Sequence, residues 1–237
     1  MGAAAVAAGA AAAVLQAAAA EAEGPWGSSQ PRWRPPQPAG FSERLLGQFL
    51  DQNFGNAYGV LLGVGEGRLA LELLNTWPRG VLFLVDPYIH LRRGFDRPGN
   101  LQDDEHQRQY DGLRTLLHDR RDVQGRYSFV REFSFALPKV WREKQWGPEP
   151  RFVYHDANPS YAAVRHDLRA WWPLLADGGV LAGANYSTLG DGSAVGVRRA
   201  VDEFAEERGL QVFVTSDPAE PSWILLKEEG ADARRPG

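Results

Sequence analysis

Apolar residues along this chain follow two patterns, one typical of buried strands and one typical of helices. Continuous apolar runs closed by glycine or Asp-Pro, such as Val81–Val85, predict strands buried on both faces. Apolar residues spaced three or four apart predict helices with one buried face. The predicted strands are Tyr58–Leu62, Val81–Val85, Tyr127–Val130, Phe152–Tyr154, Val180–Ala182, Gln211–Thr215 and Ser222–Lys227. The predicted helices are Phe41–Phe54, with Ser42 as N-cap, Arg68–Trp77, Asp103–Asp119, Tyr161–Trp172 and Val195–Arg208.

The alternation of strands and helices predicts an α/β fold with a doubly wound, mostly parallel seven-stranded sheet. The last two strands are separated only by Ser216–Pro221, which is too short for a parallel crossover. We therefore expect the final strand to be antiparallel. Sheets of this kind bind ligands outside the carboxyl ends of their strands.

The folding signals divide the chain into three parts. We expect a domain at 41–228, a front segment at 1–40 and a disordered tail at 229–237. The front segment is alanine-rich and then rich in Pro and Gly, and its first basic residue is Arg32. This pattern favours a disordered tail over a signal or transit peptide, and its alanines are too weakly apolar to hold a helix in lipid. We expect a cytoplasmic protein by default, with organelle targeting or secretion as alternatives.

Charge and composition narrow the classes of partner. The net charge is −4 and the basic residues are scattered, which argues against nucleic acid as a substrate. No cysteine is present, which excludes disulfides, thiolate metal sites and cysteine nucleophiles. Neither charge nor composition indicates an oligomeric state.

The candidate chemistry begins at a glycine loop between the first predicted strand of the domain and the helix after it. Gly63, Gly65 and Gly67 would let the backbone approach a ligand closely, although such a run is also found in ordinary turns. Asp86 follows the second strand, where a carboxylate can bind both hydroxyls of a ribose, although Asp-Pro also opens turns. The two features together occur in folds that bind nicotinamide or S-adenosylmethionine. The G-x-G-x-G spacing and the closing strand pair favour S-adenosylmethionine.

Later motifs make the resemblance specific. The segments Phe152–Ala157, Asp167-Leu168, Trp171–Pro173, Gly178-Gly179 and Ala182-Gly183 follow in the order found in one family. The chain resembles class I S-adenosylmethionine-dependent methyltransferases of the small-molecule O-methyltransferase type, with their D-A-x-H-x-Y and G-G-x-x-A-G-H-D-Y motifs. The resemblance implies that S-adenosylmethionine is the cofactor and that a hydroxylated small molecule accepts the methyl group. It implies a cofactor site of Gly63, Val64, Gly65, Glu66, Gly67, Asp86, Pro87, Phe133, Ser134 and Asp156, with Asp156, Asn185 and Tyr186 as catalytic candidates.

Several motif positions differ from the family. Leu61 stands where an acidic residue usually begins the glycine motif, Pro159 and Ser160 replace a histidine and an aspartate, and Ala184-Asn185 replaces His-Asp. Only Asp156 and Asn185 would remain for a divalent metal, so we expect none to be held. Two functions lead: an active O-methyltransferase, or a catalytically degenerate member that binds the cofactor or a partner. A nicotinamide oxidoreductase is a third alternative, which the glycine spacing and the closing strands disfavour.

Three other features are interpreted as structural. His155 is expected to be a packed or hydrogen-bonded core residue, because it lies on the opposite strand face from Asp156. Trp171-Trp172 is expected to pack in the core. Asp103–His106 is interpreted as a solvated acidic start of a helix and not as a metal site.

The front segment 1–40 lacks the periodic apolar residues needed to join a core. Its removal should therefore leave the fold intact. Thermal melts of the full and truncated chains should nearly coincide, and a decrease in Tm of about ten degrees or more would show that the segment docks on the domain.

Overall fold

The computed structural model describes residues 43–93, 99–144, 146–186, 192–215 and 221–228. Expectations for the front segment, including the Ser42 cap, and for the tail lie outside the described residues. Within the described residues, no helix is both long enough and apolar enough to cross a membrane.

The fold is a seven-stranded sheet with strand order β3-β2-β1-β4-β5-β7-β6. The five strands from β3 to β5 are parallel, and β7 runs antiparallel to both β5 and β6. This confirms the predicted fold class and the antiparallel last strand. The strands are β1 (Ala57–Leu62), β2 (Gly80–Val85), β3 (Tyr127–Val130), β4 (Phe152–His155), β5 (Val180–Gly183), β6 (Phe213–Val214) and β7 (Trp223–Leu226).

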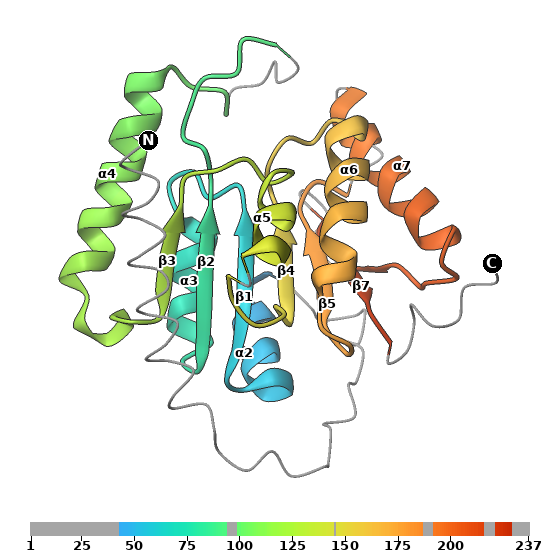
Figure 1. The fold of residues 1–237 in the computed structure, drawn as a ribbon, viewed down its shortest axis with the longest axis horizontal. Coiled ribbons are helices and arrows are strands. Elements are labelled where there is room, and N and C mark those ends of the chain that lie inside the picture. Colours follow the sequence, from blue (N-terminus) through green and yellow to red (C-terminus); the bar gives the residue numbers. More distant parts are fainter. Residues whose placement is uncertain (1–42, 94–98, 145, 187–191, 216–220, 229–237) are drawn as a thin grey trace.

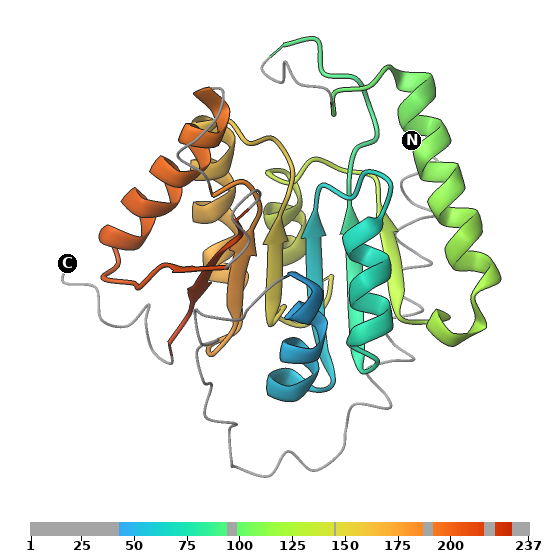
Figure 2. The same cartoon turned by 180° about the vertical axis from the view of Figure 1, so that it is seen from behind.

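Helices cover both faces of the sheet. Figure 1 shows α5, α6 and α7 in front of it, and Figure 2 shows α2, α3 and α4 on the opposite side. The helices are α2 (Glu43–Phe54), α3 (Arg68–Thr76), α4 (Asp103–Asp119), α5 (Leu137–Glu143), α6 (Tyr161–Trp171) and α7 (Gly192–Glu206), with single 3₁₀ turns at Arg121–Val123 and Trp172–Leu174.

The alternation of side chains along the central strands builds a separate core on each face. In β1, Val60 and Leu62 pack with the α5–α7 side, whereas Leu61 packs with the α2–α4 side. All three are buried. This is why the central strands are continuous apolar runs in the sequence: neither face meets water.

Two details of the fold differ from the sequence pattern. Helix α5 was not predicted, because it has only seven residues and begins at Leu137-Pro138, where the proline suits a first helical turn but suggests a loop in sequence. Strand β6 contains only Phe213 and Val214 and not the whole of Gln211–Thr215. It lies at the sheet edge and, among the described residues, pairs only with β7, so few backbone bonds extend it.

Candidate functional site

A large cavity opens at the carboxyl ends of the parallel strands, where a sheet of this topology is expected to bind a ligand. Its volume is about 1330 Å³, which exceeds the few hundred to about 1,000 Å³ usual for a single ligand. It therefore has room for a cofactor together with a second molecule. Of the residues predicted to form the site, the cavity is lined by Gly63, Val64, Gly65, Glu66, Asp86, Pro87, Phe133, Ser134, Asp156 and Asn185.

The glycine loop takes a backbone shape that only glycine adopts easily. Gly63, Gly65 and Gly67 have φ of +83°, +51° and +83°. A Cβ on Gly63 would lie 2.2 Å from the carbonyl oxygen of Asp156, whereas a Cβ on Gly65 would meet nothing within 4 Å. Gly63 thus lets two backbone segments touch, and Gly65 borders open space. Gly67 does not line the cavity, because its α carbon faces Leu113 of α4.

The Asp86 carboxylate holds the glycine loop. Its Oδ2 accepts hydrogen bonds from the backbone N–H groups of Val64 (2.9 Å) and Gly65 (3.1 Å). Its Oδ1 accepts one from the N–H of Tyr88 (2.8 Å). The sequence had suggested a ribose ligand at this position, and the structure adds a structural role that the spacing does not reveal. A carboxylate offers about four lone-pair sites, so these three bonds leave capacity for a ligand.

Tyr88 supports the same loop from the other side. It has φ of +50°, a conformation rare for a bulky residue, and it is buried. Its hydroxyl donates to the carbonyl of Gly65 (3.0 Å), and its ring packs on Tyr110 of α4 at 5.2 Å between centroids. Burial, followed by the charge of Asp86, raises the pKa of Tyr88, so the phenol stays protonated and remains a donor. Asp86 and Tyr88 together hold the loop through hydrogen bonds within the chain.

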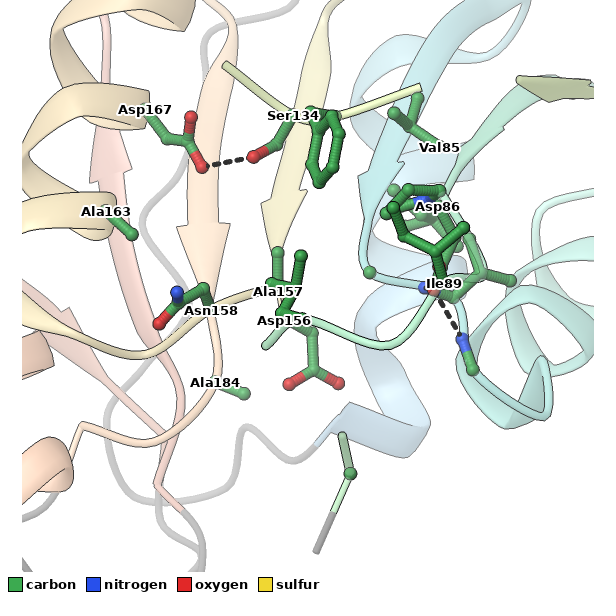
Figure 3. A pocket seen from close by; sticks show the side chains of 18 of the residues that line it. Val85, Asp86, Ile89, Ser134, Asp156, Ala157, Asn158, Ala163, Asp167 and Ala184 are labelled. Carbon is green, nitrogen blue, oxygen red and sulfur yellow. Dashed lines mark hydrogen bonds between the residues drawn. The ribbon is translucent and has the colours of Figure 1, made fainter. Parts of the chain in front are cut away.

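The catalytic candidates separate into two groups. Asp156 follows β4 and is exposed, and Figure 3 shows its carboxylate directed into the cavity near Ala184. Asn185 follows β5, lines the cavity and has φ of +61°. Tyr186 is not among the lining residues, since its hydroxyl donates to Asp202 of α7. Burial and that hydrogen bond raise the pKa of Tyr186 to about 12, which does not suit a base near neutral pH.

The substitutions after β4 have a local structural use. Ser160 is the N-cap of α6, and its hydroxyl accepts the N–H of Ala163 (3.4 Å). Asn158 Oδ1 accepts the N–H of Ser160 (3.0 Å), which closes a turn ahead of the helix. Pro159, between them, is buried. The residues that replace the expected histidine and aspartate therefore shape the start of α6.

A family model described as a methyltransferase domain matches residues 39–186, more than half of the chain. The chain belongs to the methyltransferase domain family. This confirms the family assignment made from the motifs. A comparison with the curated proteins finds no significant match.

Solved structures share the fold of this methyltransferase domain at low sequence identity. An O-methyltransferase from Bacillus cereus in complex with SAH is 14% identical, with 92% of this chain and 91% of that chain covered and a TM-score of 0.53. A protein from Corynebacterium glutamicum is 20% identical, with 92% and 90% covered and a TM-score of 0.52. The cofactor-bound Rv0187 from MTB is 16% identical, with 94% and 90% covered and a TM-score of 0.51. At these identities the likeness extends to the fold alone.

Beneath the cavity of this methyltransferase domain lies a polar network that motif reasoning did not find. Asp167 of α6 is 3% exposed, and its Oδ2 accepts the hydroxyl of Ser134 (2.6 Å) and lies 3.1 Å from Nε2 of His155. An ionised carboxylate only accepts, so this contact requires a proton on Nε2. His155 is thus a buried, hydrogen-bonded residue, as its place on the strand predicted. The network joins the end of β4 to α6 and to the loop after β3.

His106 also lines the cavity, although the sequence pattern marked it only as part of the Asp103–His106 segment. It lies in the first turns of α4, is 9% exposed and lines the cavity, yet neither ring nitrogen has a hydrogen-bond partner in the described structure. Its neighbours Asp103 and Asp104 are exposed, and Glu105 caps the helix with Gln102, so the acidic segment does begin a helix as expected. The described residues contain no group of three or more His, Asp or Glu side chains arranged to hold a metal ion.

A matched pair of substitutions tests the contact between the glycine loop and β4. Gly63→Ala and Gly65→Ala both place a Cβ at positive φ, which costs about 1–2 kcal/mol. Only Gly63→Ala also drives a Cβ into the Asp156 backbone. We expect Gly63→Ala to lower the free energy of unfolding by clearly more than Gly65→Ala in urea titrations followed by circular dichroism. Equal losses would mean that the two segments do not touch as described.

Asp86 gives a separate prediction for the ligand-free protein. Asp86→Asn replaces one acceptor oxygen by an NH₂ group that faces backbone donors, so the ligand-free domain should lose about 1–3 kcal/mol of stability. The control is Asp104→Asn, which breaks only an exposed ion pair with Arg108. It should lower the free energy of unfolding by roughly a few tenths of a kcal/mol. Unchanged urea midpoints in both variants would mean that Asp86 does not stabilise the glycine loop, which would leave it only a role in ligand binding.

Proposed function

We propose that this chain is an S-adenosylmethionine-dependent methyltransferase that methylates a hydroxyl group of a small molecule. The observation that carries the proposal is the gathering, in one cavity, of the glycine loop, Asp86, the Phe133-Ser134 loop and Asp156. These segments come from the ends of β1, β2, β3 and β4, in the order in which the motifs predicted them. Membership of the methyltransferase domain family supports the reaction class.

The residues present fit the proposed cofactor. The loop at Gly65 borders open space, so the methionine part of S-adenosylmethionine can approach the backbone without meeting a side chain. Asp86 retains lone pairs for ribose hydroxyls beyond the three that the loop occupies. The solved O-methyltransferase from Bacillus cereus, which shares the fold, was crystallised with SAH. The cavity volume leaves space for an acceptor beside the cofactor.

The bound cofactor supplies a methyl group on a positively charged sulfur, which makes that carbon electrophilic. The cofactor, held by the glycine loop and Asp86, would supply the methyl group for the acceptor oxygen, and the acceptor hydroxyl would have to give up its proton to a residue of this chain. Asp156 is the residue that we assign to orient the hydroxyl and accept its proton, because it is exposed at the end of β4 and lines the cavity. Close positioning of the two reactants supplies much of the remaining acceleration.

The residues that line the cavity around Asp156 include few other candidates for the base. Ala184 carries no polar group, and Asn185 can donate or accept a hydrogen bond but does not titrate. We assign Asn185 to orient the acceptor, because it follows β5 and lines the cavity. The mechanism therefore depends on one carboxylate.

One assay tests the proposal. With labelled S-adenosylmethionine and a panel of catechols, sugars and phenolic acids, Asp156→Asn should reduce turnover by a factor of roughly a hundred to ten thousand. Its affinity for S-adenosylhomocysteine, measured by calorimetry, should change much less, because the amide keeps the size of the side chain.

The same assay is run on a third protein, the double variant Ala184→His with Asn185→Asp. This variant restores the residues usual in the family. If the native chain turns over and only the Asp156 variant does not, the proposed methyltransferase activity is supported. Tight cofactor binding with no turnover in any of the three proteins would overturn the proposed enzymatic activity. It would favour a degenerate member of the family that binds the cofactor without turnover.

A further inference from the structure

The chain between β2 and α4 forms an arm beside the cavity, described at residues 87–93 and 99–101. Figures 1 and 2 both show its described part rising beyond the carboxyl ends of the strands, above the sheet. A reciprocal pair of hydrogen bonds closes the base of this arm. The N–H of Leu91 donates to Oδ1 of Asn100, and Nδ2 of Asn100 donates to the carbonyl of Leu91, both at 2.8 Å. The two described ends of the arm are therefore held together.

The arm gives the cavity an apolar wall. Ile89, Leu91 and Leu101 all line the cavity. Ile89 is 40% exposed, and the other two side chains are partly exposed. Aliphatic side chains that meet water beside a cavity gain free energy when an apolar surface covers them. The wall therefore suits a ligand with an apolar body, such as an aromatic ring.

Arg93 adds a positive charge to this wall. It is exposed and lines the cavity, and within the described residues no ion pair or hydrogen bond engages its guanidinium. Arg92, the residue before it, is also exposed but does not line the cavity. Arg68, the other lining arginine, directly follows the glycine loop and so belongs to the part of the cavity assigned to the cofactor. Arg93 is therefore the arginine that a second molecule can meet.

Arg93 and Asp156 stand on different strands of the sheet and would act on opposite ends of such a molecule. The arm leaves β2, Asp156 follows β4, and β1 lies between these two strands. Neighbouring strands are about 4.8 Å apart, so the two strand ends are separated by about 10 Å. An anionic group is attracted to a guanidinium and repelled by a carboxylate. A negative charge on the acceptor would therefore turn that end toward the arm and leave its hydroxyl facing Asp156.

We propose that the arm binds the methyl acceptor and that Arg93 selects an acceptor with a negative charge, in its simplest form a hydroxylated aromatic acid. This inference rests on the proposed function and names the class of acceptor. A guanidinium can donate two parallel hydrogen bonds to a carboxylate, and bonds to an ionised group are about twice as strong as bonds to a neutral one. The charge of the acceptor thus decides how tightly it binds and which end faces the cofactor.

A charged and a neutral acceptor of similar shape test the assignment. The probes are dihydroxyphenylpropanoic acid and its methyl ester, each assayed with labelled S-adenosylmethionine. The native chain should methylate the acid with a kcat/KM about three- to tenfold higher, between the values for an exposed ion pair and for a hydrogen bond to a charged group. The difference should lie in KM and should shrink at high salt. Arg93→Gln should remove the preference, whereas the matched control Arg92→Gln should keep it.

Each outcome decides a separate point. Equal efficiency with acid and ester in the native chain, or an unchanged preference in Arg93→Gln, overturns the inference and leaves the proposed function standing. Calorimetry should show native affinity for S-adenosylhomocysteine in Arg93→Gln, and a loss of that affinity would assign Arg93 to the cofactor and overturn the inference.

Two further outcomes concern turnover and folding. If neither probe is methylated but a neutral catechol is, the inference fails and the proposed function stands, and if no compound is methylated both fail. If Arg93→Gln does not fold, as checked by circular dichroism, the native chain decides: a preference for the acid that shrinks with salt supports the inference, and one that does not shrink overturns it.

Discussion

The contact between the backbones of Gly63 and Asp156 is the constraint on which the site depends. The two segments leave β1 and β4, which are neighbouring strands in the sheet, and they touch so closely that no side chain fits between them. The N–H of Asp156 also donates to the carbonyl of Leu62 (2.7 Å). Because this contact is made by the main chain, the glycine loop and the candidate catalytic carboxylate keep a fixed relation that side-chain motion cannot loosen.

The remaining supports of the cavity extend outward from that contact. Asp86 and Tyr88 hold the far side of the glycine loop, and Tyr110 and Leu113 of α4 pack behind Tyr88 and Gly67. All of these contacts are made between groups of the chain itself. A site preorganised in this way loses little conformational entropy when a ligand binds. The strained backbone at Tyr88 is offset by the hydrogen bonds that its amide and hydroxyl make.

The sequence predicted the parts of the fold that depend on local pattern. Buried parallel strands such as Val81–Val85 appear in the sequence as continuous apolar runs. The glycine spacing together with Asp86 indicated where the cavity would lie. Partners that are distant in the chain could not be predicted. Nothing near Tyr186 in sequence shows that its hydroxyl would meet Asp202, and nothing near Asp167 shows that one of its oxygens would be left without a partner. Both depend on how α6 and α7 pack on the sheet, which a one-dimensional pattern does not encode.

The antiparallel strand β7 affects the order in which the cavity can be completed. It lies between β5 and β6, so the outer edge of β5 has no partner until a segment beyond α7 has returned to the sheet. Strands β1 to β4 can pair with one another before that segment is available. During synthesis, which proceeds from the N-terminus, the half of the cavity around the glycine loop can therefore assemble early. Until β7 docks, the edge of β5, the strand that leads to Asn185, presents unpaired backbone groups, and such exposed edges favour aggregation.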